Sequence, residues 1–245
     1  MDILVYDTEG MSNMNPQDTE EYRKYVIGEM SRADLIRCIL LRPKVTLYNS
    51  DTNTGFEATY SHSPMMNLYF TRDQSITTPR GYIISQMNSK QRADEAQLIS
   101  FCYEQLGVKP ILTITGDGRL EGGDYLRGGD ISYIGCGMRT NIEAIKQVME
   151  ADAFGHDTVA VVKDHKWWQM QMHLDTYFNI IDKDLCTLVE SRYYAKEGDP
   201  EWVTVDVYTR KAGEKSYKLT RKDVPFVEYL TEQGFTIIPI SQADE

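Results

Sequence analysis

The pair of residues in this sequence best suited to proton transfer beside a cation is a histidine and an aspartate two positions apart. They are His173 and Asp175, in the run Met172-His173-Leu174-Asp175. On an extended strand, residues i and i+2 point to the same face, so we expect the imidazole and the carboxylate to lie together. Such a pair can transfer protons and hold a positive charge. A His-x-Asp pair is also common on ordinary protein surfaces, so the neighbouring residues must show whether this pair is functional.

Asp175 is the third of three aspartates that recur at one spacing. The intervals from Asp73 to Asp124 and from Asp124 to Asp175 are 124 − 73 = 51 and 175 − 124 = 51 residues. Each aspartate precedes two short strand-like stretches joined by a turn, then a helical stretch and another apolar stretch. Internal repeats of this length indicate similar units that pack against one another. A radial arrangement of the units would bring the three aspartates to one central site.

The predicted elements follow from hydrophobic periodicity and capping signals. Each repeat is predicted to contain strand, strand, helix and strand, and the third contains an insertion over 191–218 with a hairpin near 202–208. Ahead of the repeats we expect a helix over 16–42, a short strand over 45–48 and a polar loop over 49–66. Thr140 and Glu143 form a predicted capping box at the start of the second helix. The predicted helices of the repeats cover about 90–106, 140–149 and 221–233.

Composition narrows the class of protein. The chain has 245 residues and 41% hydrophobic residues, enough for a sizeable core. Its net charge of −11 argues against nucleic acid as the main partner, because phosphate binding needs an excess of Lys and Arg. No stretch approaches about 18 consecutive apolar residues, and the N-terminus lacks the pattern of a signal peptide. We therefore expect no membrane segment and a cytoplasmic location.

The cysteines fit the same expectation. They are Cys38, Cys102, Cys136 and Cys186, and none forms a C-x-x-C pair. Isolated cysteines in a chain that is not rich in them are typical of reduced thiols in a cytoplasmic protein.

Four stretches together resemble one known family. They are Asn67–Asp73, Leu120–Asp124, Ile134–Thr140 and Met172–Thr176, which resemble the arginine deiminases of the guanidino-group-modifying, or amidinotransferase, superfamily. The motifs occur in the family's order over about residues 64–245. The resemblance implies an α/β fold, a five-bladed propeller of ββαβ units, of which about three blades are visible here. It divides the chain into an N-terminal helical segment, 1–50, and a catalytic propeller domain, 51–245, that is incomplete at its C-terminal side.

The resemblance also implies roles for the motif residues. Asp73 and Asp175 would grip the substrate's guanidinium, whose planar fork of donors matches carboxylates. His173 would act as general acid and base, and Glu121 would orient it. The implied substrate-binding residues are Asn67, Asp124, Arg139 and Arg92, with Arg139 and Asn67 on the substrate's α-carboxylate. Taken singly, each has an ordinary structural explanation, such as a strand cap, a turn residue or an ion pair. The family uses no cofactor and no metal.

One feature departs from the family pattern. The family's nucleophile is a cysteine in the last blade, and none of the four cysteines here has that context. We therefore expect that this chain is a fragment of a longer enzyme and does not turn over arginine. The implied reaction converts arginine and water to citrulline and ammonia through a cysteine-bound amidino intermediate. The alternatives are an amidinotransferase, another guanidino-group hydrolase and a non-catalytic guanidine-binding module. Agmatine is disfavoured, because Asn67 and Arg139 suit a free α-carboxylate, and a homo-oligomer stays open.

Overall fold

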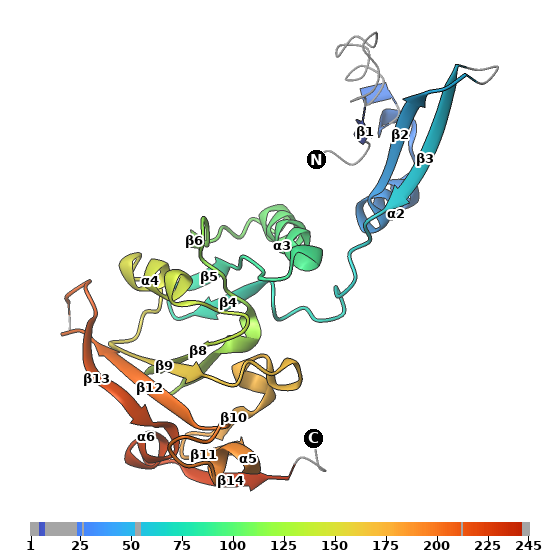
Figure 1. The fold of residues 1–245 in the computed structure, drawn as a ribbon. Helices are drawn as coiled ribbons and strands as arrows, with labels where there is room; N and C mark the ends of the chain where they lie inside the picture. The colour runs from blue at the N-terminus through green and yellow to red at the C-terminus, as the bar shows by residue number, and fades with distance from the viewer. Residues whose placement is uncertain (1–4, 8–23, 26, 52–54, 212, 242–245) are drawn as a thin grey trace. The chain divides into compact units, whose positions relative to one another are not determined.

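The chain forms two compact units, Met1–Leu68 and Tyr69–Glu245 (Figure 1). The computed structural model describes residues 5–7, 24–25, 27–51, 55–211 and 213–241. The division falls between Leu68 and Tyr69, later in the chain than the boundary near residue 50 expected from the sequence.

The first unit combines helical segments with a three-stranded sheet. One helix is α2 (Arg32–Leu41), and the strands are β1 (Val5–Asp7), β2 (Pro43–Asn49) and β3 (Phe56–His62). β1 pairs with β2 in parallel, and β2 pairs with β3 antiparallel. The prediction of a loop over 49–66 is therefore wrong for Phe56–His62, which forms β3. The alternation of Phe56, Ala58 and Tyr60 with polar residues is the strand signal that the polar composition hid.

The helix predicted over 16–42 is interrupted in the described part of the chain. Ser31 caps a new helix, because its side chain accepts a hydrogen bond from the Asp34 amide. The predicted stop is confirmed, since Arg42 adopts a left-handed conformation with φ of 49° immediately before Pro43. Residues 16–23 and 26 lie outside the described residues.

The second unit contains three repeats of strand, strand, helix and strand, as predicted. The first repeat is β4 (Ser75–Thr78), β5 (Gly81–Ile84), α3 (Ala93–Gln105) and β6 (Leu112–Thr113); the second is β7 (Tyr125–Gly128), β8 (Ile131–Cys136), α4 (Ile142–Glu150) and β9 (Thr158–Asp164); the third is β10 (Phe178–Asp182), β11 (Leu185–Val189), α6 (Phe226–Glu232) and β14 (Thr236–Ile240). In each repeat the first two strands pair antiparallel and the second pairs in parallel with the last. The architecture is mixed α/β.

Short elements complete this unit. Three-residue 3-10 turns are η1 (Lys90–Arg92), η2 (Gly122–Asp124), η3 (Gln169–Gln171) and η4 (Leu174–Thr176), and the short helix α5 (Glu190–Tyr193) follows β11.

The described part of the chain holds no helix of the length and apolar character needed to cross a membrane.

The insertion in the third repeat forms a hairpin that joins the sheet of the second repeat. Its strands are β12 (Val203–Thr209) and β13 (Lys218–Pro225), and β12 pairs antiparallel with β9. The resulting sheet has the order β13-β12-β9-β8-β7. The prediction of a helix that begins near Arg221 is therefore wrong at its start, because β13 continues to Pro225 and α6 begins at Phe226. The charged residues of β13 are those of an exposed edge strand.

The five-stranded sheet separates two apolar cores. On β8, Tyr133 belongs to the core shared with the third repeat, and Ile134 belongs to the core shared with the first. Both side chains are fully buried. Because both faces of the sheet are covered, β8 and β9 are apolar almost throughout. The second repeat is thus the central layer against which the other two repeats are positioned.

Candidate active site

The three equally spaced aspartates lie in the turns that lead into the first strand of each repeat. Asp73 precedes β4, Asp124 ends η2 before β7, and Asp175 lies in η4 before β10. The expectation of a strand through His173 and Asp175 is wrong, because η4 begins at Leu174. His173 itself is extended, with φ of −121° and ψ of 159°, and caps that turn.

A pair of glycines in η2 lets the three turns approach one another. A Cβ on Gly122 would lie 1.9 Å from the carbonyl oxygen of Arg72, in the first repeat. A Cβ on Gly123 would lie 2.7 Å from His173 Nδ1 and 2.9 Å from Asp175 Oδ1, in the third repeat. The side chains of His173 and Asp175 therefore do converge, against Gly123, although a 3-10 turn rather than a strand places them. Glycine is required at both positions because any side chain would force the repeats apart.

An imidazole stands between two buried carboxylates at this junction. His173 Nε2 lies 2.8 Å from Glu121 Oε2, and His173 Nδ1 lies 3.9 Å from Asp73 Oδ1. All three side chains are buried. The structure therefore brings together His173, Glu121, Asp73 and Asp175, one or two from each repeat.

The surrounding charges favour the protonated form of His173. Burial by itself lowers the pKa of this imidazole, but the hydrogen bond with Glu121 and the negative charges of Asp124 and Asp73 outweigh it, so the pKa of His173 is raised. An imidazolium in this position can donate a proton to a departing group, and the neutral form can then take one from water.

Contacts to both its side chain and its backbone hold Glu121 in place. Its Oε1 accepts a hydrogen bond from the Asn88 amide at 3.0 Å, and its own amide donates to Thr140 Oγ1 at 3.1 Å. Arg139 Nη1 lies 3.8 Å from Oε1. The prediction of Thr140 as a helix cap is wrong, because Asn141 caps α4 by accepting from the Ala144 amide. Thr140 instead holds the backbone of Glu121.

Asp73 is held by a buried ion network. Arg92 Nη1 donates to Asp73 Oδ2 at 2.7 Å, and Arg92 Nη2 donates to Glu95 Oε2 at 2.8 Å. Gln74 Nε2 also donates to Glu95 Oε2, at 2.8 Å. Burial lowers the pKa of Arg92, but its bonds to Glu95 and Asp73 outweigh this and raise it. Arg92 thus positions Asp73, and its expected role in substrate binding stays a prediction.

Asp175 has a guanidinium partner that was not expected from the sequence. Arg72 Nε lies 3.0 Å from Asp175 Oδ2, and Arg72 Nη2 donates to the Tyr125 carbonyl at 2.9 Å. Burial raises the pKa of Asp175, against the charges of Arg72 and His173, which lower it. A signal was present, because Arg72 directly precedes Asp73 in the equivalent turn of the first repeat.

Asp124 supports the cluster through the backbone of η4, and its expected role in substrate binding stays a prediction. Its Oδ1 accepts from the Leu174 amide at 2.9 Å, so it anchors η4 and with it His173. Burial raises the pKa of Asp124 to about 6, although the charge of His173 lowers it. Close packing is possible because Gly135 lies opposite, where a Cβ would be 2.4 Å from Asp124 Oδ1.

Arg139 lies at the side of the cluster and Asn67 belongs to the first unit. Arg139 Nη2 donates to Gln169 Oε1 at 3.2 Å and contacts Met172 Sδ at 3.3 Å. Its Nε is buried, with no hydrogen-bond partner among the described residues. An unpaired donor beside Glu121 suits a group that a substrate would bring. The expected role of Asn67 stays a prediction.

The cysteines of the second unit are poor nucleophiles where they stand. Burial raises the pKa of Cys136 to about 11 and that of Cys186 to about 11. The nucleophilic form of cysteine is the thiolate, which is scarce at neutral pH when the pKa is that high. Cys102 is exposed on α3, and Cys38 is half-buried on α2 in the first unit.

The arrangement is suited to a planar cation. Asp73, Glu121, Asp124 and Asp175 surround one imidazole, and arginine side chains already pair with three of these carboxylates, Asp73, Glu121 and Asp175. Within the residues that the structure describes, no three His, Cys, Asp or Glu side chains are placed to hold a metal ion.

The sequence matches one protein family over most of its length. The family model described as arginine deiminase matches residues 17–245. The arginine deiminase of Halobacterium salinarum is 29% identical over 237 residues, covering 72% of this chain and 47% of that protein. That of Oenococcus oeni is 35% identical over 183 residues, covering 69% of this chain and 44% of that protein. The chain thus spans less than half the length of these two relatives.

Solved structures of similar shape were also found. A dimethylarginine dimethylaminohydrolase, solved as an adduct with 4-chloro-2-hydroxymethylpyridine, has a TM-score of 0.47 at 21% identity and covers 71% of this chain and 55% of that chain. The enzyme from Pseudomonas aeruginosa, complexed with citrulline, has a TM-score of 0.44 at 20% identity and covers 71% of this chain and 69% of that chain.

Proposed function

Because this chain belongs to the arginine deiminase family, we propose that its cluster of carboxylates binds the guanidinium group of arginine for hydrolysis to citrulline and ammonia. The observation that carries the proposal is the placement of His173 between Glu121 and Asp73, with Asp175 beside it against Gly123. Three repeats contribute one or two residues each to this single site. The match to the family adds the substrate class.

Asp73 and Asp175 are the proposed guanidinium ligands. A guanidinium presents a rigid fork of N–H donors, and carboxylates on two sides of it hold its carbon still for attack. Arg92 and Arg72 already bind one oxygen of Asp73 and Asp175, which supports the view that these carboxylates face guanidinium groups. Arg139, with its unpaired buried Nε, is the proposed contact for the substrate's α-carboxylate.

His173 is the proposed general acid and base. A thiolate attacks the guanidinium carbon, and His173 gives its proton to the ammonia that leaves. Water then adds to the amidino carbon while His173 takes one of its protons, and the thiolate departs to leave citrulline. The raised pKa of His173 supports the first step, because it favours the protonated imidazole that donates the proton.

The proposed reaction needs a nucleophile that this chain does not supply. Cys136 and Cys186 are buried, and their pKa values of about 11 disfavour the thiolate. We therefore propose that the thiolate comes from outside these 245 residues. In the same proposal the three repeats are three blades of an α/β propeller whose axis passes the cluster.

The alternatives share guanidinium binding and differ in the chemical step after it. An amidinotransferase would pass the amidino group to an amine, and another guanidino-group hydrolase would accept a substituted guanidine. A guanidine-binding module would use the same carboxylates without any reaction. Because binding is common to all of them, it is tested before turnover.

The test of binding is calorimetric titration of the whole chain with L-arginine and with agmatine. We expect arginine to bind more tightly than agmatine, because agmatine lacks the carboxylate proposed to meet Arg139. Asp175→Asn and Asp73→Asn should each weaken arginine binding by about tenfold or more, since each removes a charged hydrogen-bond partner. Asp130→Asn, in the exposed turn between β7 and β8, is the matched control and should have no effect.

The test of turnover is citrulline release with and without an added small thiol. We expect none from the chain alone and a slow, thiol-dependent release that His173→Gln abolishes. Citrulline without added thiol, lost on changing one of the four cysteines, would contradict the proposal that the nucleophile is supplied from outside. Equal arginine affinity in Asp175→Asn, Asp73→Asn and Asp130→Asn would contradict the proposed site itself.

A further inference from the structure

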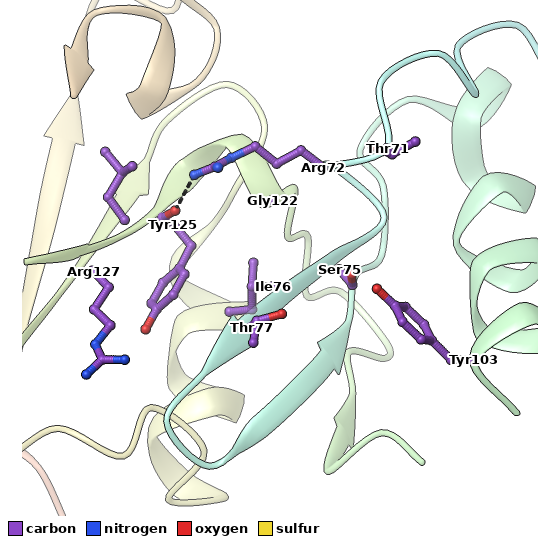
Figure 2. Close-up of a pocket in the computed structure, with 10 residues that line it drawn as sticks. Thr71, Arg72, Ser75, Ile76, Thr77, Tyr103, Gly122, Tyr125 and Arg127 are labelled. Carbon is purple, nitrogen blue, oxygen red and sulfur yellow. Dashed lines mark hydrogen bonds between the residues drawn. The ribbon is translucent and has the colours of Figure 1, made fainter. Parts of the chain in front are cut away.

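A groove in the second unit is lined in part by two arginines, one of which, Arg72, also contacts Asp175 of the carboxylate cluster. It has a volume of about 430 Å³ and lies between β4 of the first repeat and β7 of the second. Figure 2 shows Arg72 along one side of it, with its guanidinium at the Tyr125 carbonyl. The ring of Tyr125 and the side chain of Arg127 lie at one end, and Tyr103 lies at the other.

The lining of this groove is unusual for a chain with a net charge of −11. It contains two arginines, Arg72 and Arg127, and no carboxylate. Among the described residues, no hydrogen bond or ion pair involves the guanidinium of Arg127. Arg72 is paired with Asp175, so the exposed, unpaired guanidinium of Arg127 supplies the net positive charge of the groove, which a small anion would neutralise.

Neutral donors and apolar walls complete the lining. Hydroxyl groups are contributed by Thr71, Ser75 and Thr77 of the first repeat, and in Figure 2 the hydroxyl of Tyr103 points toward Ser75. Ile76 and Leu126 add apolar surface. A phosphate or carboxylate group matches the guanidinium forks and hydroxyl donors, and a compact apolar body matches the walls.

We propose that this groove binds a small organic anion, a phosphate monoester or carboxylate with a compact apolar body, through Arg72 and Arg127. Arg72 then serves two sites. Its Nε is 3.0 Å from Asp175 Oδ2, and its Nη2 bonds to the Tyr125 carbonyl, so part of its donor fork remains for the groove.

The shared arginine couples the groove to the carboxylate cluster. An anion that draws the charge of Arg72 toward the groove weakens its hold on Asp175. Asp175 is then freer to accept a substrate guanidinium, so the anion should tighten arginine binding. This coupling rests on the proposed function, whereas anion binding in the groove does not. By linkage, arginine should tighten anion binding by the same factor.

The first experiment is calorimetric titration of the full chain with phenyl phosphate. We expect saturable one-to-one binding, weaker binding of inorganic phosphate, which lacks the apolar body, and none of phenol, which lacks the charge. Arg127→Gln should weaken phenyl phosphate binding by about tenfold or more, the effect of losing one charged hydrogen-bond partner. Lys218→Gln removes the same charge from exposed β13, and its affinity for phenyl phosphate should stay within about twofold of the wild-type value.

Three results would overturn the groove as an anion site. They are an absence of saturable binding, equal affinities of Arg127→Gln and Lys218→Gln, and a loss of binding in Arg139→Gln with none in Arg127→Gln. The last result would place the anion at the proposed carboxylate contact instead. Circular dichroism of each variant shows whether it is folded, and Arg127→Lys, which keeps the charge but loses the fork, should fall between wild type and Arg127→Gln.

The second experiment measures arginine affinity with and without saturating phenyl phosphate. We expect about a fivefold tightening in the wild-type chain, at the low end of ordinary coupling between sites, and none in Arg127→Gln. Unchanged or weaker arginine binding in the wild type would overturn the coupling. If arginine fails to bind under any condition, the proposed function fails, while the phenyl phosphate titration still decides the groove.

Discussion

The first and second repeats have the same order of elements but hold their helices in different ways. Helix α4 of the second repeat buries Ala144, Ile145, Val148 and Met149 in an apolar core. Helix α3 of the first repeat buries Glu95 and Ala96 and exposes the apolar Phe101, and its C-cap residue Leu106 is exposed as well. The second helix is fixed by packing, whereas the first is tied down at its start by the buried ions of Arg92 and Glu95.

The same contrast applies to the equivalent aspartates. Asp73 of the first repeat is bound by Arg92, whereas Asp124 of the second accepts from a backbone amide and is buried without a guanidinium partner among the described residues. Equivalent positions in the two repeats therefore have different energetics. The first repeat uses its buried contacts to hold a carboxylate of the site, and the second provides the layer that supports it.

The largest expected effect comes from breaking the ion network of the first repeat. Arg92→Met leaves Asp73 and Glu95 buried without their cation, which should lower the free energy of unfolding by about 3–5 kcal/mol. The matched control is Arg80→Met, whose pair with Asp152 is half exposed on the arginine side and should contribute less than about 1 kcal/mol. Urea unfolding followed by circular dichroism measures both. Equal losses would remove the contrast between the repeats.

Packing in the second repeat gives the next largest effect. Ile145 is 0% exposed, so Ile145→Ala creates a cavity and should lower the free energy of unfolding by about 2–4 kcal/mol. Phe101 is 44% exposed on α3, and Phe101→Ala should change it by less than about 0.5 kcal/mol despite removing a larger side chain. The same urea titrations would contradict this prediction if Phe101→Ala lost more unfolding free energy than Ile145→Ala.

The aspartate without a guanidinium partner should give a pH signature. Burial raises the pKa of Asp124 from its ordinary 3.8 to about 6. The folded chain then holds this proton more tightly than the unfolded chain, so its stabilising contribution is present below about pH 4 and lost as the pH rises through about 6. Relative to Asp124→Asn, the wild type should lose about 2–3 kcal/mol of unfolding free energy over that range. Parallel pH profiles of the two proteins would show that Asp124 is not perturbed.

The smallest expected effect concerns the helix caps. Asn141 caps α4 with its side chain, so Asn141→Ala should lower the free energy of unfolding by about 1 kcal/mol. Ser89 stands at the start of η1, ahead of α3, and makes no side-chain cap bond, so Ser89→Ala should change it by less than about 0.5 kcal/mol. Urea titrations of the two variants measure both changes. A larger loss of unfolding free energy for Ser89→Ala than for Asn141→Ala would contradict the prediction.

Much of the repeat could be predicted from the sequence because its signals are local. The interval of 51 residues between Asp73, Asp124 and Asp175 marks equivalent turns, and apolar periodicity marks the strands and helices between them. The polar strands were the exceptions. In β3 the polar composition hid an alternation of apolar and polar residues, whereas β13 is charged and exposed and is a strand because of its partner β12, which periodicity does not reveal.

The clustering of His173, Glu121, Asp73 and Asp175 could be predicted from the sequence, but the contacts that bring them together could not. His173 and Asp175 converge because Gly123 leaves room for them, and that depends on a contact between repeats. The same is true of Arg72 on Asp175 and of Thr140 on Glu121. Such partners lie some 20 to 100 residues apart in the chain, so sequence spacing alone does not identify them.

The central claim is that a guanidinium binds beside His173, and the chain's four histidines allow a direct test. The measurement is an NMR titration of the histidine ring signals with L-arginine, assigned through His173→Gln. The account predicts that the signals of His173 shift and saturate with the calorimetric affinity, while those of His62, His156 and His165 stay in place. Signals of His173 that do not move at saturating arginine would contradict it.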